Sequence, residues 1–180
     1  MAVGGGRHGD RNRSKENAMI RGVHHVAMVT PDLARTLAFY TDVLGCVLMG
    51  ETEWDPNDRY GQSFDRVVGL DRSAAHVAMV RAGNVALEFF EYHEPHCDAP
   101  PQSQANMPGW RHVAFDVKNL DALHHRLTQA GVLFHDEPQD LGLARTIYAR
   151  DPHNNIIEFQ ELVGDDNPLE LGVFAPSTYL

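Results

Sequence analysis

Hydrophobic and polar positions along the chain follow one pattern that occurs twice. Each copy begins with a short apolar stretch of strand-forming residues, 22–29 and 109–117, with histidine in its interior. A turn and a helix-start signal follow, and an amphipathic run then ends at a glycine, Gly45 in the first copy and Gly131 in the second. The chain is therefore expected to contain two copies of one structural unit.

The two copies match in detail at their first and last strands. His25-Val26-Ala27 corresponds to His112-Val113-Ala114, at an offset of 112 − 25 = 87 residues. Both copies close on an apolar strand with a glutamate in its middle, Glu88 and Glu158, each followed by phenylalanine. A carboxylate inside such a strand is costly unless it is paired or bound to a metal. Two histidines and two glutamates therefore occupy matching places of a repeat.

The spacing of apolar residues predicts the order β-α-β-β-β in each copy. In the first copy, Thr30 is expected to cap a helix that has Pro31 at its first position. One copy has too few strands for a stable core, so we expect the copies to pack on each other. The predicted strands are 22–29, 46–51, 75–80, 84–91, 110–117, 132–136, 144–149 and 155–161, and the predicted helices are 31–44, 63–70 and 119–130.

Composition divides the chain into five segments. The N-terminus is rich in Gly, Arg and Asn without periodicity, which predicts a disordered leader. A stretch with several prolines and no periodicity separates the two copies and predicts a linker. The predicted segments are a leader over 1–19, a first module over 20–97, a linker over 98–108, a second module over 109–163 and a C-terminal tail over 164–180.

The bulk properties exclude several classes of partner. The chain has 180 residues and is 43% hydrophobic, enough for a sizeable core, and its net charge of −10 disfavours nucleic acid and acidic membrane surfaces. Two cysteines do not form a disulfide framework, and a reducing cytoplasm fits them. No apolar segment has transmembrane length, and the N-terminus lacks the apolar core of a signal peptide. We expect a cytoplasmic protein that acts on a small-molecule substrate.

The repeated histidines and glutamates indicate a metal site. If the first and fourth strands of a copy are neighbours, the histidine and glutamate of that copy can converge. Two copies would then bring His25, Glu88, His112 and Glu158 to one point, a donor set that suits Ni, Co, Mn, Fe or Zn. Octahedral coordination would leave two positions for water or substrate oxygens. A single strand histidine is more often a hydrogen-bonded core group, but the repetition in register favours one divalent metal ion.

The motifs around these residues resemble the vicinal oxygen chelate superfamily, which includes glyoxalase I, methylmalonyl-CoA epimerase, extradiol dioxygenases and fosfomycin or bleomycin resistance proteins. His25-Val26-Ala27, Pro31-Asp32-Leu33, Phe39-Tyr40 and Val43-Leu44-Gly45 are similar to its opening, and residues 148–158 are similar to its closing signature. The resemblance covers about residues 20–163. It implies an α+β fold of two tandem βαβββ modules, an open curved sheet or incomplete barrel around a metal cleft. The implied ligands are the same four residues, and a homodimer is suggested by the resemblance alone.

One motif departs from the family pattern. The family usually has Asp-Pro-Asp-Gly before the last strand, where this chain has Asp151-Pro152-His153-Asn154. A turn at this place often needs a left-handed residue, and asparagine is the best substitute for glycine there. We therefore expect the turn to be preserved.

Three functions remain open. The resemblance favours a glyoxalase-type lyase or an epimerase that works through a metal-stabilised enolate, with Glu158 or Glu88 as the catalytic base. The second is an extradiol dioxygenase with Fe(II) held by His112, Glu158 and His25, although a fourth ligand at Glu88 argues against it. The third is a protein that binds a drug or metabolite without turnover, although such members tend to lose the metal residues.

A few further residues are candidates for substrate binding. Arg145 and Tyr148 precede the last strand and are candidates for orienting the substrate, with a purely structural role equally open. His76, on the third predicted strand, is a weaker candidate for the cleft. The long irregular insertion over 54–72 is the expected source of substrate specificity.

Overall fold

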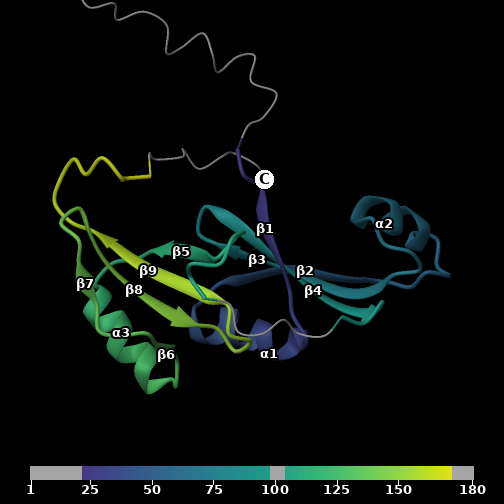
Figure 1. The fold of residues 1–180 in the computed structure, drawn as a ribbon, viewed down its shortest axis with the longest axis horizontal. Helices are drawn as coiled ribbons and strands as arrows, with labels where there is room; N and C mark the ends of the chain where they lie inside the picture. The colour runs from purple at the N-terminus through teal and green to yellow at the C-terminus, as the bar shows by residue number, and fades with distance from the viewer. Residues whose placement is uncertain (1–21, 98–103, 172–180) are drawn as a thin grey trace, which may run out of the picture.

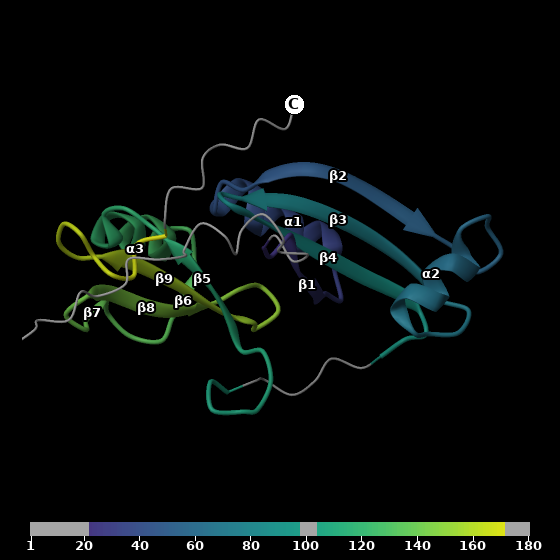
Figure 2. The ribbon, with the colours of Figure 1, turned by 90° about the horizontal axis from the view of Figure 1, so that it is seen from above.

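The computed structural model describes residues 22–97 and 104–171 (Figures 1 and 2). The predicted leader, residues 1–19, lies outside the described residues, as do 98–103 of the predicted linker and 172–180 of the predicted tail. Within the described part of the chain, no helix is long and apolar enough to cross a membrane.

The first module forms a four-stranded sheet with the strand order β1-β4-β3-β2. Strands β1 and β4 run parallel, while the β2–β3 and β3–β4 pairs are antiparallel. The elements are β1 (His25–Val29), α1 (Leu33–Ala38), η1 (Phe39–Val43), β2 (Val47–Trp54), α2 (Gly61–Val68), β3 (Ala74–Ala82) and β4 (Val85–Glu94).

The second module repeats this arrangement in a five-stranded sheet with the order β5-β9-β8-β6. Strands β5 and β9 are parallel, and a short additional strand, β7, pairs with β8. The predicted strand over 132–136 corresponds to the two-residue strand β6, and β7 lies beyond the predicted range. The elements are β5 (His112–Asp116), α3 (Leu120–Gln129), β6 (Leu133–Phe134), β7 (Gln139–Asp140), β8 (Ala144–Arg150) and β9 (Ile156–Leu162).

The predicted α+β fold of two repeated modules is confirmed. The two sheets lie side by side, with α1 and α3 below them in the view of Figure 1. Within the described residues neither sheet closes into a barrel. Each sheet therefore has a face toward its helix, which we call the helix face, and an opposite face, which we call the open face.

One hydrophobic core runs through both modules on the helix faces. Buried residues of both modules belong to one cluster. The removal of their apolar side chains from water stabilises the fold. Two polar contacts also join the modules: the Tyr40 hydroxyl donates to Asp151 at 3.3 Å, and the Arg126 guanidinium donates to the carbonyl oxygen of Val43 at 2.9 Å. The core includes Leu33, Tyr40, Leu87, Phe89, Leu120, Leu127, Ile157 and Phe159.

The start of the first helix differs from the prediction. Asp32, and not Thr30, caps α1, because its carboxylate accepts a hydrogen bond from the Arg35 amide at 2.9 Å. The Thr30 hydroxyl lies 2.7 Å from that of Thr36 and is buried there. Helix α1 then continues as the π-helical segment η1, so the predicted helix over 31–44 begins later and changes its winding.

The turn before the last strand is preserved, as predicted. Asn154 has a φ angle of +66°, in the left-handed region that asparagine tolerates better than most residues. Asp151 organises this turn, because one of its carboxylate oxygens accepts hydrogen bonds from the amides of His153 and Asn155, both at 2.9 Å. The turn thus delivers β9 to the sheet in fixed register.

Candidate functional site

The parallel pairing of β1 with β4 and of β5 with β9 places a histidine beside a glutamate in each sheet. In the first sheet Ala27 of β1 is the partner of Glu88 on β4, and in the second Ala114 of β5 is the partner of Glu158 on β9. Each histidine lies two residues before its alanine, so it shares the open face with the glutamate. The predicted convergence of the first and fourth strands of each copy is therefore found.

The first pair consists of His25 and Glu88. The histidine Nε2 lies 3.3 Å from the Glu88 Oε2, and the side chains are 40% and 20% exposed. The other ring nitrogen of His25, Nδ1, lies 2.9 Å from Nδ1 of His24. The Nε2 and the carboxylate of this pair thus face each other at the surface of the open face.

The second pair consists of His112 and Glu158. The Nε2 and Oε2 atoms are 3.1 Å apart, and the side chains are 35% and 11% exposed. Two hydroxyl groups of β8 support this pair: Thr146 donates to Glu158 Oε1 at 2.5 Å, and the Tyr148 hydroxyl lies 3.4 Å from His112 Nδ1. Burial, and then the charge of Glu158, raise the pKa of Tyr148, so this phenol keeps its proton at neutral pH.

The four side chains do not converge within one chain. Among the described residues, no group of three or more His, Cys, Asp or Glu side chains is placed to hold a metal ion. Each pair lies on the open face of its own sheet, and the two sheets lie side by side (Figures 1 and 2). One chain therefore offers two half-sites in place of the single four-donor point that the sequence predicted.

The donor chemistry of each half-site fits a divalent ion. Imidazole nitrogen and carboxylate oxygen are ligands of the borderline metals, and each pair directs Nε2 toward the carboxylate. The Nδ1 atoms of His25 and His112 contact a neighbouring side chain, the arrangement that orients histidine ligands in metal sites. Two donors are too few for a tightly held ion, so further donors are needed to complete the coordination.

The other candidate residues, Tyr148, Arg145 and His76, lie on different faces of their sheets. Tyr148 lies on the open face beside His112, as an orienting residue would. Arg145 and His76 lie on the helix faces: Arg145 donates two hydrogen bonds to Asp121, and His76 lies 3.1 Å from Glu51. Since both are directed away from the glutamates of the pairs, their placement gives no support to a role in substrate binding.

A cavity of about 490 Å³ adjoins the second pair. Trp110 lies two residues before His112, the first residue of β5, and its side chain is 92% exposed. An exposed tryptophan beside a candidate metal ligand is a surface that a small molecule can cover. The cavity is lined by Ala105, Gly109, Trp110, Arg111, His112 and Tyr148.

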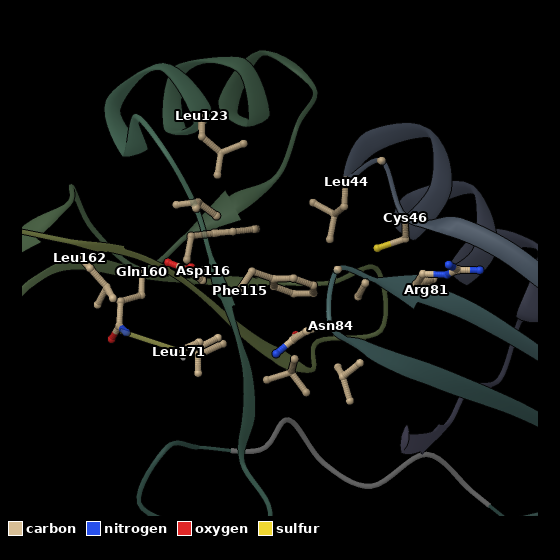
Figure 3. Close-up of a pocket in the computed structure, with 18 of the residues that line it drawn as sticks. Leu44, Cys46, Arg81, Asn84, Phe115, Asp116, Leu123, Gln160, Leu162 and Leu171 are labelled. Atoms are coloured by element: carbon tan, nitrogen blue, oxygen red, sulfur yellow. The ribbon is translucent and has the colours of Figure 1, made fainter. Parts of the chain in front are cut away.

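A larger cavity of about 620 Å³ lies between the two modules (Figure 3). It is bordered by the end of η1, the β3–β4 hairpin, β5 and β9, with Leu169 and Leu171 from the C-terminal segment. None of the four residues of the pairs lines it. Size alone therefore does not identify the site, because the donors lie on the open faces.

An aromatic cluster extends the open face of the first sheet beyond Glu88. Trp54 stacks on Phe64 of α2 with ring centroids 4.3 Å apart, and Phe90 and Tyr92 continue from Glu88 along β4. Burial, and then the charge of Glu88, raise the pKa of Tyr92. The predicted insertion over 54–72 thus begins with a buried tryptophan, Trp54, although the segment as a whole is polar.

Comparisons with known proteins agree with this fold. Residues 22–159 match the family profile of the Glyoxalase/Bleomycin resistance protein/Dioxygenase superfamily. A 2-epi-5-epi-valiolone epimerase from an Actinomyces species is 34% identical over 66% of this chain, and the match spans 64% of that relative's length. The relative is thus matched over less than two thirds of its own sequence.

Solved structures show the same fold. A glyoxalase family protein from Bacillus cereus is 24% identical, with a TM-score of 0.71 over 82% of this chain and 98% of that one. The trypanothione-dependent glyoxalase I of Leishmania major is 20% identical, with a TM-score of 0.54 over 79% of this chain and 87% of that one. The duplicated modules, the paired strands and the family match lead to one conclusion: the chain belongs to the Glyoxalase/Bleomycin resistance protein/Dioxygenase superfamily, and the vicinal oxygen chelate resemblance of its sequence is confirmed.

Proposed function

We propose that this protein is a divalent-metal-dependent epimerase of a small ketone. The observation that carries the proposal is the matched pair of contacts, His25 with Glu88 at 3.3 Å and His112 with Glu158 at 3.1 Å, in one register of both sheets. The sequence similarity to an epimerase supports the reaction type. Retention of all four donors argues against the dioxygenase and the non-catalytic binding protein.

A second copy of the chain completes the metal site in this proposal. Each pair lies on an open face that bears exposed apolar side chains, such as Val29 and Val47 in the first module, so the faces are suited to being covered. In a two-fold dimer, the first module of each copy meets the second module of the other. Two equal sites result, each with the donors His25, Glu88, His112 and Glu158, and each holding one ion of the type Ni, Co, Mn, Fe or Zn.

The proposed reaction moves a single proton. The bond between hydrogen and the carbon next to the carbonyl breaks, so that the proton passes to a carboxylate and the electron pair passes toward the carbonyl oxygen. The electron pair then returns to the carbon, which takes a proton from a carboxylic acid on its opposite side. A divalent ion bound by these residues would polarise the carbonyl, which lowers the cost of negative charge on its oxygen. Glu88 and Glu158 are the carboxylates available to take up and return the proton, and Tyr148 retains its own proton as a hydrogen-bond donor.

Metal content and isotope exchange test this function together. Purified protein is expected to contain one divalent ion per chain by elemental analysis. In ²H₂O, 2-epi-5-epi-valiolone is expected to gain deuterium at the carbon next to its carbonyl, with the rate lost after EDTA treatment and recovered on adding Co²⁺. Such recovery excludes irreversible damage by the chelator.

Other outcomes of the same experiment contradict the proposal. Oxygen uptake with catechols by the metal-loaded protein would establish the dioxygenase function. Binding of the ketone without exchange, by a protein that contains no metal, would establish a binding protein.

A further inference from the structure

The two half-sites share a register but differ in their support. Glu158 Oε1 accepts a hydrogen bond from Thr146 at 2.5 Å, in addition to the contact of Oε2 with His112. Among the described residues, Glu88 has a contact with His25 and no further hydrogen bond. The exposed fractions follow the same order, since the Glu158 side chain is 11% exposed and the Glu88 side chain 20%. One carboxylate is held at both oxygens and the other at one.

The difference between the two carboxylates comes from the residues of the neighbouring strands, β8 and β3. Thr146 of β8 pairs with the residue two places after Glu158, and in the first sheet Val77 of β3 pairs with the residue two places after Glu88. Val77 is therefore the counterpart of Thr146, and it is buried against Trp54 with no group that could donate. The counterpart of Tyr148 is likewise apolar, because Met79 stands opposite Glu88.

The hydroxyl proton of Thr146 has two acceptors within reach. Its Oγ1 lies 2.5 Å from the Glu158 carboxylate and 3.2 Å from the carbonyl oxygen of Phe159. A hydroxyl can donate its one proton to a single acceptor at full strength, and a charged acceptor at the shorter distance gives the stronger bond. The Thr146 hydroxyl therefore donates its hydrogen bond to Glu158 while the Glu158 carboxylate is ionised.

We infer that Thr146 is a positioning residue that makes Glu158 the stationary carboxylate of the site and leaves Glu88 as the movable one. The inference rests on the proposed function, because it assigns unequal roles within that metal site. The second module would then hold the ion when it is bound, and Glu88 would be free to take up a proton. Partners that orient metal ligands change metal affinity about 10–100-fold when they are removed, which sets the size of the expected effect.

A calorimetric titration of the protein with Co²⁺, without substrate, tests this assignment. We expect Thr146→Val to weaken Co²⁺ binding about 10–100-fold. Thr146→Ser restores the hydroxyl without the methyl group and is expected to recover most of the wild-type affinity, which a purely packing role for Thr146 would not produce. Urea unfolding of each variant separates loss of affinity from loss of structure.

The matched variant Val77→Thr tests the movable half. It introduces a donor beside Glu88, so Co²⁺ is expected to leave the protein more slowly in the presence of EDTA, while substrate deuterium exchange slows. Wild-type Co²⁺ affinity in Thr146→Val, or faster Co²⁺ release in Val77→Thr, would overturn the assignment while the proposed function stands. Failure of the wild-type protein to bind Co²⁺ would overturn the proposed function and the inference with it.

Discussion

The Glu88→Gln variant is expected to lose metal affinity and turnover together. Glutamine keeps the size of the side chain and can still meet His25, but it removes the charged oxygen that lies 3.3 Å from the ring nitrogen. Loss of a proton-transferring group typically costs a factor of about 10²–10⁴ in rate, and we expect a decrease of that size in deuterium exchange. Because a direct ligand is removed, Co²⁺ affinity is expected to decrease by more than about 100-fold.

Glu91→Gln is the matched control for this variant. Glu91 lies three residues further along β4, on the helix face, where its carboxylate accepts a hydrogen bond from the Leu33 amide at 2.9 Å. The control is expected to lose some stability and to bind Co²⁺ as the wild type does. Unchanged metal content and activity in Glu88→Gln would remove Glu88 from the site and would favour the dioxygenase interpretation.

The Asp151→Ala variant is expected to have the largest effect on stability. Asp151 is buried, and its carboxylate accepts hydrogen bonds from two backbone amides, from the Asn155 side chain and from the Tyr40 hydroxyl of the other module. Its removal leaves these donors without their acceptor, at a cost of roughly 1–3 kcal/mol per buried group that finds no water. We expect the free energy of unfolding, measured in urea, to decrease by about 3 kcal/mol.

Tyr40→Phe isolates the contact between the modules. Burial, and then the Asp151 charge, raise the pKa of Tyr40 well above its usual range, so the hydroxyl is a donor at neutral pH. Removing it is expected to cost about 1 kcal/mol, the net value of one hydrogen bond. Equal destabilisation by both variants would contradict the interpretation that Asp151 mainly organises the turn before β9.

The sequence predicted the features that depend on local pattern. The offset between His25 and His112 revealed the duplication, and the repeated apolar strands placed each glutamate on the same face as its histidine. Asn154 was expected in a left-handed turn, and its φ angle of +66° confirms this. These features follow from alternation and turn chemistry over a few residues, which a single sequence contains.

Features that depend on tertiary pairing were not predicted. The alternation of a strand does not show whether two half-sites of one chain meet each other or remain apart, because the packing of the two sheets decides it. Thr146 was missed, although it shares a face with Tyr148 at a spacing of two. Arg145 and Tyr148 are three residues apart on one strand, so alternation alone could have shown that they point to opposite faces.

Complementation between two defective chains tests the central claim most directly. One chain carries His25→Ala and Glu88→Gln, the other carries His112→Ala and Glu158→Gln, and the mixed assembly is purified through two different tags. If each site joins the first module of one copy to the second module of the other, the mixed dimer regains one of its two sites, so Co²⁺ per chain reaches about half of the wild-type value. Neither parent chain alone is expected to bind Co²⁺ tightly. A mixed assembly that binds no Co²⁺, beside a wild-type protein that does, would contradict the account.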